Sequence, residues 1–549
     1  MKTLHKKYIA ILVIANLLLA STSCKKFLVE DNPAGRTAET YYTTKQGYED
    51  LIRSNYTPLR SIYLFGAFYW LGTDAFSTGI TTDVHPMNIY SASLNPSLVD
   101  MDTYWKQLYY SVQLTNTALY WADKVTDLDA ATLAARKGEA KALRALYYYM
   151  LAETWGDVPL VLTPSDQATF GYTRTAEQKI YDQIIQDLTE AIDALPVAAT
   201  ANFGRVTKGM AQHLLAKVYL TRGYKSYAVA TDFTKAAELA EAVIAGPYTL
   251  LTDFTKLFDP AVTGFQVNTE VIFSVQYSSN TATNGTGNWL HQHFTMDMSV
   301  YPAIGRSSFY NKAQQAYAPT PWFFTLFDKT RDARYQATVN TAIYAQVASG
   351  VFAVGDTAIY FPDVAWTAAQ KAAVKYYVFN PDEYRNITSF SNRSFPSFKK
   401  FREVGLAYAD GLGTRDTYVF RLAETYLIAA EAYLKANNGT EALKKFNAVR
   451  KRGGKTGTNP ATGLLYKDEM VATALTIDDI LDERARELAG EELRWFELKR
   501  TGKLVERTLL RNDEAKAAAK LQSIHTLRPI PQNQIDLNRG ELGQNLGYQ

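Results

Sequence analysis

The chain has 549 residues, of which 47% are hydrophobic and 21% charged, and this composition excludes an intrinsically disordered protein. It carries 58 basic and 55 acidic residues, and the three lysines of residues 1–23 leave 55 of each in the rest of the chain. Formal neutrality argues against nucleic acid as a partner, because no basic excess is available for a phosphate backbone.

Residues 1–23 have the order of a secretory signal. A basic start of three lysines precedes an apolar run at 8–20, and three small residues stand directly before Cys24. The run is shorter than the roughly 20 residues that a membrane-spanning helix needs. Cys24 is the chain's one cysteine, so its place behind the leader predicts a lipid-modified N-terminus. The alternative is cleavage near Ala20, and Ser21 stands where a bacterial lipobox usually carries leucine.

An apolar pattern with the i, i+3, i+4, i+7 spacing of an amphipathic helix recurs along the chain. It fits residues 105–112, 142–149, 181–188, 211–218, 236–243 and 423–430. Ala142 and Ala211 are 69 residues apart, close to two units of a helix–turn–helix repeat of roughly 34 residues. We therefore predict a mainly α chain with tetratricopeptide-like helical hairpins over about 40–260 and 417–505. Ordinary bundle helices are the alternative.

The helical pattern fades between about residues 262 and 416. Residues 271–277 (VIFSVQY) predict a strand, and turn-rich stretches surround it. An irregular, loop-rich insertion in a helical scaffold is typical of a binding region. A later helix is predicted from Thr476, which forms a capping-box pattern with Asp479, to Gly502.

The sequence carries no clear catalytic or metal-binding motif. Gly454–Thr456 resembles the end of a P-loop, but it follows a helix, and no HExxH or GxSxG arrangement is present. His291 and His293 would share one face of a strand, yet they lack an acidic or cysteine partner and are interpreted as a surface pair. Acidic residues in 483–492 are interpreted as solvated helix surface. A glycoside hydrolase that draws two carboxylates from distant loops stays open.

Short segments spread over nearly the whole chain form an ordered set. They are KKFLVEDNP after the cysteine, WGDVPLV at 155–161, RVTKGMAQHLLAKVYL at 205–220, Asp332 and Arg334 in PWFFTLFDKTRDARY, RLAETYLIAAEAYL at 421–434, ERARELAGEELRWFELKRTGK at 483–503, and LRPIPQNQIDLN with QNLGY at the end. Together they resemble the SusD/RagB-like nutrient-binding lipoproteins of Gram-negative bacteria. Ser21 in the lipobox and Lys25–Lys26, where acidic residues are common, depart from the family pattern.

The resemblance implies one domain over residues 24–549, with ligand loops in the insertion at 262–416 and a closing loop at 521–549. It implies no enzymatic activity, no cofactor and no metal. Proteins of this family bind oligosaccharide, or in some branches peptide, and cap a SusC-like TonB-dependent transporter that takes up the ligand. N-terminal acylation at Cys24 would hold the chain in the lipid of the outer membrane, on the cell surface. Arg421 and the region 487–495 would be packing and ion-pair residues of the scaffold.

The ligand site is expected in the loops after the first helix and in the insertion, as in the family. A sugar site needs exposed aromatic rings beside carboxylate, amide or guanidinium groups. The residues that meet this need are Trp70, Asp74, Asp83, Tyr90, Trp289, Tyr301, Arg306 and Trp366. Burial is the alternative for each aromatic residue, because tryptophan is highly buried on average. We expect a loop face with aromatics from 66–100 and 280–370, and a helical-repeat face that docks on the transporter.

Overall fold

The computed structural model describes residues 37–79, 84–165, 169–197, 203–262, 264–313, 316–384, 394–409, 411–491 and 493–548. The leader at 1–23, Cys24 and Asp83 lie outside the described residues, so the predictions made for them stay predictions. Within the described part, no helix is both long enough and apolar enough to cross a membrane.

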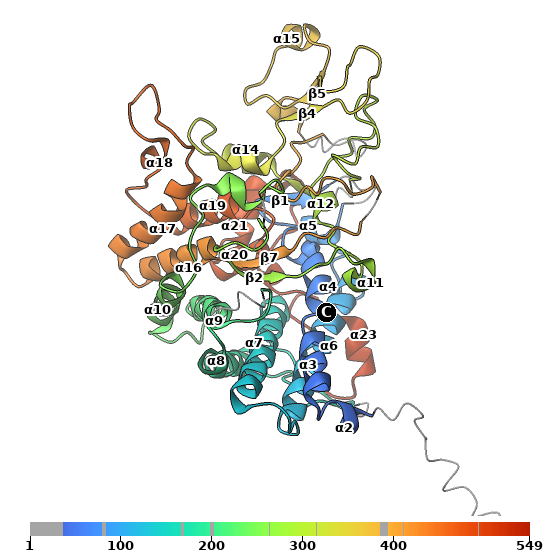
Figure 1. Cartoon of the computed structure of the whole chain (residues 1–549), viewed down its shortest axis with the longest axis vertical. Coiled ribbons are helices and arrows are strands. Elements are labelled where there is room, and N and C mark those ends of the chain that lie inside the picture. Colours follow the sequence, from blue (N-terminus) through green and yellow to red (C-terminus); the bar gives the residue numbers. More distant parts are fainter. Residues whose placement is uncertain are drawn as a thin grey trace, which may run out of the picture.

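Antiparallel helices that pack in series form the larger part of the molecule and confirm the predicted hairpin scaffold (Figure 1). They are α6 (Val99–Ala122), α7 (Ala130–Trp155), α8 (Glu177–Ala194), α9 (Lys208–Arg222), α10 (Asp232–Ile244), α16 (Leu422–Lys435) and α17 (Gly439–Gly453). Each helix packs against the next in this order, so α16 follows α10 directly in space although residues 245–421 separate them in the sequence. The insertion therefore leaves the scaffold and returns to it between two neighbouring helices.

Local capping sets where the scaffold helices begin and end. Asp129 accepts a hydrogen bond from the Thr132 N–H at 2.8 Å before α7, and Thr207 caps α9 in the same way. α7 ends at Gly156, whose φ of +74° suits glycine. The first helices of the described chain, two of which pack on α6, are α2 (Ala38–Tyr41), α3 (Lys45–Ser54) and α4 (Pro58–Leu64).

The helix predicted from Thr476 to Gly502 is two helices. They are α19 (Ile477–Glu487) and α20 (Arg494–Arg500). The capping box of Thr476 and Asp479 is confirmed, but the chain turns at Gly490, where φ is +72° and a Cβ atom would lie 2.7 Å from the Phe401 ring. The prediction of one helix was wrong because a tertiary contact sets this turn. The other C-terminal helices are α18 (Tyr466–Glu469), α21 (Leu504–Arg511), α22 (Asp513–Ala518) and α23 (Gln532–Leu537).

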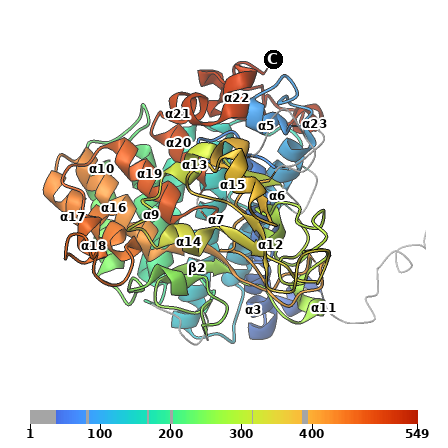
Figure 2. The same cartoon turned by 90° about the horizontal axis from the view of Figure 1, so that it is seen from above.

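Among the residues that the structure describes, short strands of the insertion and its neighbours form three small sheets. The pairs are β1 (Phe76–Thr78) with β3 (Tyr317–Pro319), β2 (Val271–Val275) with β7 (Thr417–Arg421), and β4 (Ala342–Tyr344) with β5 (Thr357–Tyr360), which also pairs with β6 (Tyr377–Val378). The strand predicted at 271–277 is thus confirmed over its first five residues. The short helices among these strands are α5 (Pro86–Ile89), α11 (Thr281–Asn284), α12 (Leu290–His293), α13 (Pro321–Thr325), α14 (Arg334–Thr338) and α15 (Ala368–Ala372). Seen from above, α12 to α15 lie over the scaffold helices (Figure 2).

Buried ion pairs join the base of the insertion to α19. Arg421 lies 2.5 Å from Glu270 and 3.1 Å from Glu487, and Arg334 lies 2.6 Å from Glu483. All of these side chains are buried, so the interpretation of Glu483 and Glu487 as solvated surface was wrong. The ion-pair role that the resemblance implied for Arg421 and Glu487 is confirmed. Burial alone would raise the pKa of Glu483, but the charge of Arg334 and two further arginines holds it well below its usual range. The network joins the base of the insertion to α19.

Candidate functional site

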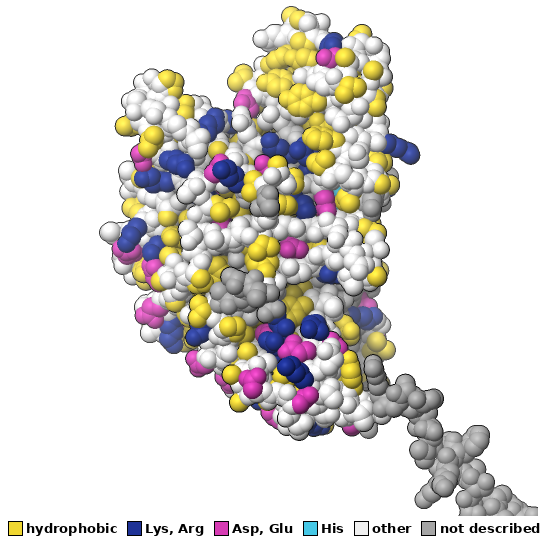
Figure 3. Space-filling view, in the orientation of Figure 1, with side chains coloured by type: hydrophobic (Ala, Val, Ile, Leu, Met, Phe, Trp, Pro, Cys, Tyr) yellow, Lys and Arg dark blue, Asp and Glu magenta, His cyan; other side chains and the backbone are white. Residues whose placement is uncertain are grey.

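A lobe around β4, β5 and α15 projects from one end of the molecule (Figure 1). Hydrophobic side chains gather on its surface, near the top of the space-filling view (Figure 3). Its exposed large hydrophobic residues are Tyr344, Val347, Val351, Val354, Val364 and Tyr377. Apolar side chains gathered on a surface in this way mark interaction sites. We call the surface of residues 286–313, 341–380 and 402–409 the loop face.

Four of the predicted contact residues are buried: Trp70, Asp74, Tyr90 and Tyr301. Trp70 packs against the rings of Phe294 and Tyr317, each with a centroid distance of 5.0 Å, and the Tyr90 hydroxyl donates to the Gly72 carbonyl at 2.6 Å. Trp70 is 4% exposed and Tyr90 is 2% exposed. These two aromatic residues belong to the hydrophobic core, so the prediction that they contact the ligand was wrong.

Asp74 is a buried counter-ion. Its carboxylate lies 2.8 Å from Arg494 and 2.7 Å from Arg507, and its side chain is fully buried. Burial would raise the pKa of Asp74, but the two guanidinium groups outweigh it and lower that pKa. The carboxylate is therefore ionised and paired with two arginines. The prediction that Asp74 contacts a sugar was wrong.

Tyr301 and Tyr377 form an aromatic pair on one side of the lobe. Their ring centroids are 4.9 Å apart, and the hydroxyl group of Tyr301 lies 3.0 Å from Ser394 Oγ. Tyr301 is almost covered, whereas Tyr377 is 48% exposed. On β4, which β5 separates from the β6 strand of Tyr377, Tyr344 is also 48% exposed, and its N–H donates to the Tyr310 hydroxyl at 2.9 Å. The buried ring of Tyr301 thus packs against the exposed ring of Tyr377, and the sequence interpretation missed both Tyr377 and Tyr344.

Trp366 lies in a different aromatic group. Its half-buried ring packs against Tyr360 at 5.5 Å and Tyr376 at 6.4 Å, and the Asn380 side chain hydrogen-bonds both its N–H and its carbonyl at 2.9 Å. The parallel register places Tyr377 beside Ile359, one residue before Tyr360, and successive strand residues point to opposite faces. The lobe therefore carries aromatic rings on both faces of its sheet, and Tyr301 and Trp366 are not brought together.

Trp289 and Arg306 lie on two loops beside the segment 402–413. The half-buried ring of Trp289 packs closely over Gly411, where a Cβ atom would lie 3.0 Å from the ring, and its Nε1 donates to the Thr286 carbonyl at 2.6 Å. Arg306 is exposed, with its guanidinium 5.9 Å from the centre of the Tyr408 ring. Of the predicted contacts, these two and Trp366 have accessible side chains, so they remain in the candidate site.

Of the histidine pair, His291 is buried and His293 is half-buried. His291 and His293 lie on α12, where His291 is 4% exposed and His293 packs edge-on to Tyr317 at 5.4 Å. Burial, with a smaller contribution from His291, lowers the pKa of His293 to about 4. The prediction of a surface pair was therefore wrong. The described part of the chain holds no group of three or more His, Cys, Asp or Glu residues suited to a metal ion.

Comparisons with known proteins agree with this architecture. A family model described as SusD family matches residues 269–548, and one described as starch-binding associating with outer membrane matches residues 73–220. SusD-like protein P25 of Formosa agariphila is 25% identical over 96% of both chains. The starch-binding protein SusD of Bacteroides thetaiotaomicron is 26% identical over 83% of this chain and 80% of its own.

Solved structures share the fold. A laminarin-binding SusD-like protein superposes with a TM-score of 0.66 at 23% identity, over 92% of this chain and 100% of the other. Surface glycan-binding protein A from Bacteroides thetaiotaomicron, solved in complex with laminarihexaose, gives a TM-score of 0.67 at 22% identity, over 91% and 99%. At these identities the likeness demonstrates a shared tetratricopeptide-like helical fold.

Proposed function

This chain belongs to the SusD family, and we propose that it is an outer-membrane protein that binds oligosaccharide on its loop face and delivers it to a TonB-dependent transporter. The observation that carries the ligand class is the set of exposed aromatic rings on the lobe, led by Tyr344 and Tyr377. Such rings offer flat apolar surfaces to the C–H faces of sugar units. The guanidinium of Arg306 offers hydrogen-bond donors on the same face.

The same geometry favours binding without turnover. A glycosidase needs a carboxylic acid with a raised pKa that faces a second carboxylate across the substrate. Burial raises the pKa of Asp416 to about 6, but its oxygens accept hydrogen bonds from the Tyr277 N–H and from Gln276 Nε2, both at 2.9 Å. Asp416 therefore holds a loop in place. The buried carboxylates of Asp74 and Glu483 are held ionised by arginines and are unsuited to donate a proton.

Titration calorimetry with the purified chain tests the ligand class. The panel contains maltohexaose, laminarihexaose, cellohexaose and a set of short peptides, and each mixture is also analysed for shortened products. We expect binding of at least one hexasaccharide without product formation. Binding of peptides alone would contradict the carbohydrate assignment, and shortened sugars that accumulate catalytically would contradict the assignment as a binding protein.

Delivery to a transporter is the second element of the proposal. The family description, which names association with the outer membrane, supports it, and stacked helical hairpins present the extended surface that a large partner requires. A pull-down of the native protein from outer membranes in mild detergent tests it. We expect a co-purifying β-barrel transporter. Recovery of the chain without a barrel partner would contradict delivery while leaving the ligand assignment intact.

A further inference from the structure

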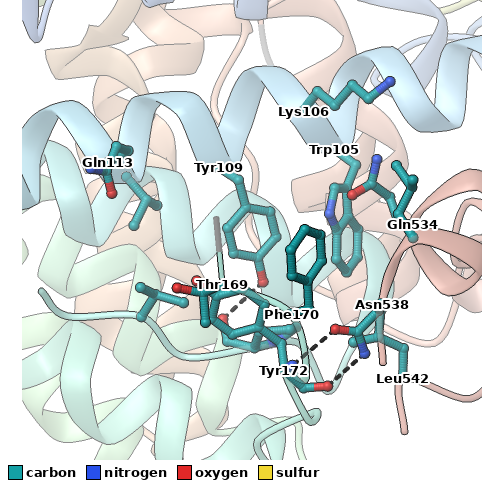
Figure 4. A pocket seen from close by; sticks show the side chains of 14 residues that line it. Trp105, Lys106, Tyr109, Gln113, Thr169, Phe170, Tyr172, Gln534, Asn538 and Leu542 are labelled. Atoms are coloured by element: carbon teal, nitrogen blue, oxygen red, sulfur yellow. Dashed lines mark hydrogen bonds between the residues drawn. The ribbon is translucent and has the colours of Figure 1, made fainter. Parts of the chain in front are cut away.

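A pocket of about 350 Å³ opens on the helical scaffold (Figure 4). Its walls come from three parts of the chain: α6, the residues 159–161 and 169–172 that follow α7, and the C-terminal residues 534–542, which include part of α23. In Figure 1 these elements lie away from the lobe. The volume falls within the range of small-molecule sites, roughly 300–1,000 Å³.

Aromatic rings form the floor and one side of this pocket. Trp105 and Tyr109 have ring centroids 5.0 Å apart, and the Tyr109 hydroxyl donates to the Pro159 carbonyl at 2.8 Å. Phe170 lies beside these two rings in Figure 4, and 52% of its surface is exposed. The inner rings are thus fixed by packing and hydrogen bonding, while the outer ring is accessible.

The opposite wall is held together by Asn538. Its Oδ1 accepts hydrogen bonds from the N–H groups of Gly171 at 3.0 Å and Tyr172 at 2.9 Å, and its Nδ2 donates to the carbonyls of Tyr172 and Gly540 at 2.8 Å each. At Gly540 a Cβ atom would lie 2.5 Å from the Tyr172 carbonyl oxygen, so the two segments can approach this closely only with glycine there. The pocket is therefore built in the folded chain and does not need a ligand to form it.

The ammonium group of Lys106, which lines the pocket, is paired with a carboxylate. Lys106 Nζ lies 2.5 Å from Asp102 Oδ2, and Gln534 Nε2 donates to Asp102 Oδ1 at 2.8 Å. Asp102 balances Lys106, the charged side chain of the pocket lining, while the Arg539 guanidinium, outside the lining, lies 5.1 Å from the centre of the Phe170 ring. The Gln534 side-chain oxygen, for which the described residues supply no donor, and the remaining N–H bonds of Lys106 can still bind a ligand. A wholly apolar ligand would bury these groups without partners, which is unfavourable.

We propose that this pocket is a second carbohydrate site, which takes a neutral sugar unit between Phe170 and the Gln534 amide. A neutral sugar has apolar C–H faces for the rings and hydroxyl groups for the amide and the ammonium group, so it satisfies both walls. The proposal takes its ligand class from the proposed function but uses none of the loop-face residues. Two sites on one chain would raise the apparent affinity for a long polysaccharide that spans both.

Binding assays on a variant without the loop-face rings test this site. The full chain with Tyr344→Ala, Tyr377→Ala and Trp366→Ala is titrated with maltohexaose, laminarihexaose and cellohexaose, in a detergent that has no sugar headgroup. We expect residual binding of at least one hexasaccharide with one site per chain. Adding Phe170→Ala or, separately, Gln534→Ala to this variant should weaken that binding at least tenfold. Phe170 is exposed, so its replacement leaves the fold intact, and circular dichroism checks this.

The outcomes separate the two proposals. If the wild-type chain binds a hexasaccharide and the triple variant binds none, the second site is overturned and the loop-face site stands. If the triple variant binds as the wild type does and Phe170→Ala abolishes that binding, the loop-face site fails and the second site stands. Residual binding that neither Phe170→Ala nor Gln534→Ala changes overturns the second site. An apolar dye whose binding depends on Phe170, without any sugar binding, overturns its ligand class.

Discussion

Arg421 Nη1 lies 2.5 Å from Glu270 Oε1, and this ion pair joins the last residue of β7 to the residue directly before β2. The polypeptide of the insertion runs from one partner to the other, so the pair closes the base of the loop face. Arg421 also lies 2.5 Å from Glu491 and 3.1 Å from Glu487. One buried guanidinium thus holds both ends of the insertion against the C-terminal helices.

Arg421→Ala should therefore lower the free energy of unfolding by about 3–5 kcal/mol, because it leaves buried carboxylates without a counter-ion. Urea unfolding followed by circular dichroism measures the change. Arg53→Ala is the matched control, since Arg53 pairs with Asp50 at the surface with 61% of its side chain exposed, and it should cost less than about 1 kcal/mol. Equal effects of the two variants would contradict the role given to Arg421.

Asp74→Ala should destabilise the fold without acting directly on ligand binding. The variant leaves Arg494 and Arg507 facing each other in the interior, at a cost of about 3–5 kcal/mol. Thermal unfolding measures the loss, and calorimetry on the fraction that remains folded measures affinity. If the Asp74→Ala protein were folded and of normal stability but no longer bound oligosaccharide, Asp74 would be a ligand contact after all.

His293 predicts a pH dependence of stability. Its pKa is about 4 in the folded chain, against 6.5 for a free histidine, so between these values the unfolded chain binds a proton that the folded chain does not. The stability from its neutral ring is present above pH 6.5 and is lost as the pH falls toward 4, by about 3 kcal/mol in all. Urea unfolding of the wild type and of His293→Phe over this range measures it. A stability difference between the two proteins that does not change with pH would contradict the assignment.

Cys24→Ser should move the protein from the membrane fraction to the soluble fraction. The reason is that several acyl chains on one cysteine give durable attachment, whereas the neutral chain has no charge-based affinity for lipid. Fractionation and mass spectrometry of the native N-terminus measure the effect. An unmodified N-terminus at Ser21 or Thr22 would contradict lipidation.

The helical scaffold follows from the sequence, because the apolar spacing of segments such as 142–149 and 423–430 is a local property that tertiary packing preserves. The turn at Gly490 could not be predicted from the sequence, because its cause is the Phe401 ring, which is far away in the chain. The family resemblance indicated that the insertion contains the ligand site. Composition alone does not locate the ligand site in the insertion.

Individual site residues were harder to predict. The sequence does not show whether an aspartate in a loop faces solvent or a buried partner. Asp74 pairs with an arginine that is 420 residues away in the chain. Tyr377 was missed because its exposure depends on a two-residue strand that pairs in parallel with β5, a contact that no local pattern reports. The abundance of tyrosine was the one available signal, and it does not distinguish Tyr377 from buried tyrosines such as Tyr104.

The affinity of matched tyrosine variants for oligosaccharide tests the central claim most directly. Tyr344→Ala/Tyr377→Ala removes two half-exposed rings from the loop face, and Tyr110→Ala/Tyr120→Ala removes two rings of similar exposure from α6. Calorimetry with the hexasaccharide that the wild type binds should give a loss of about 1–3 kcal/mol for each loop-face ring, by analogy with stacking on aromatic platforms. The α6 variant should bind as the wild type does. Unchanged affinity of a folded Tyr344→Ala/Tyr377→Ala protein would contradict the claim that the loop face holds the ligand.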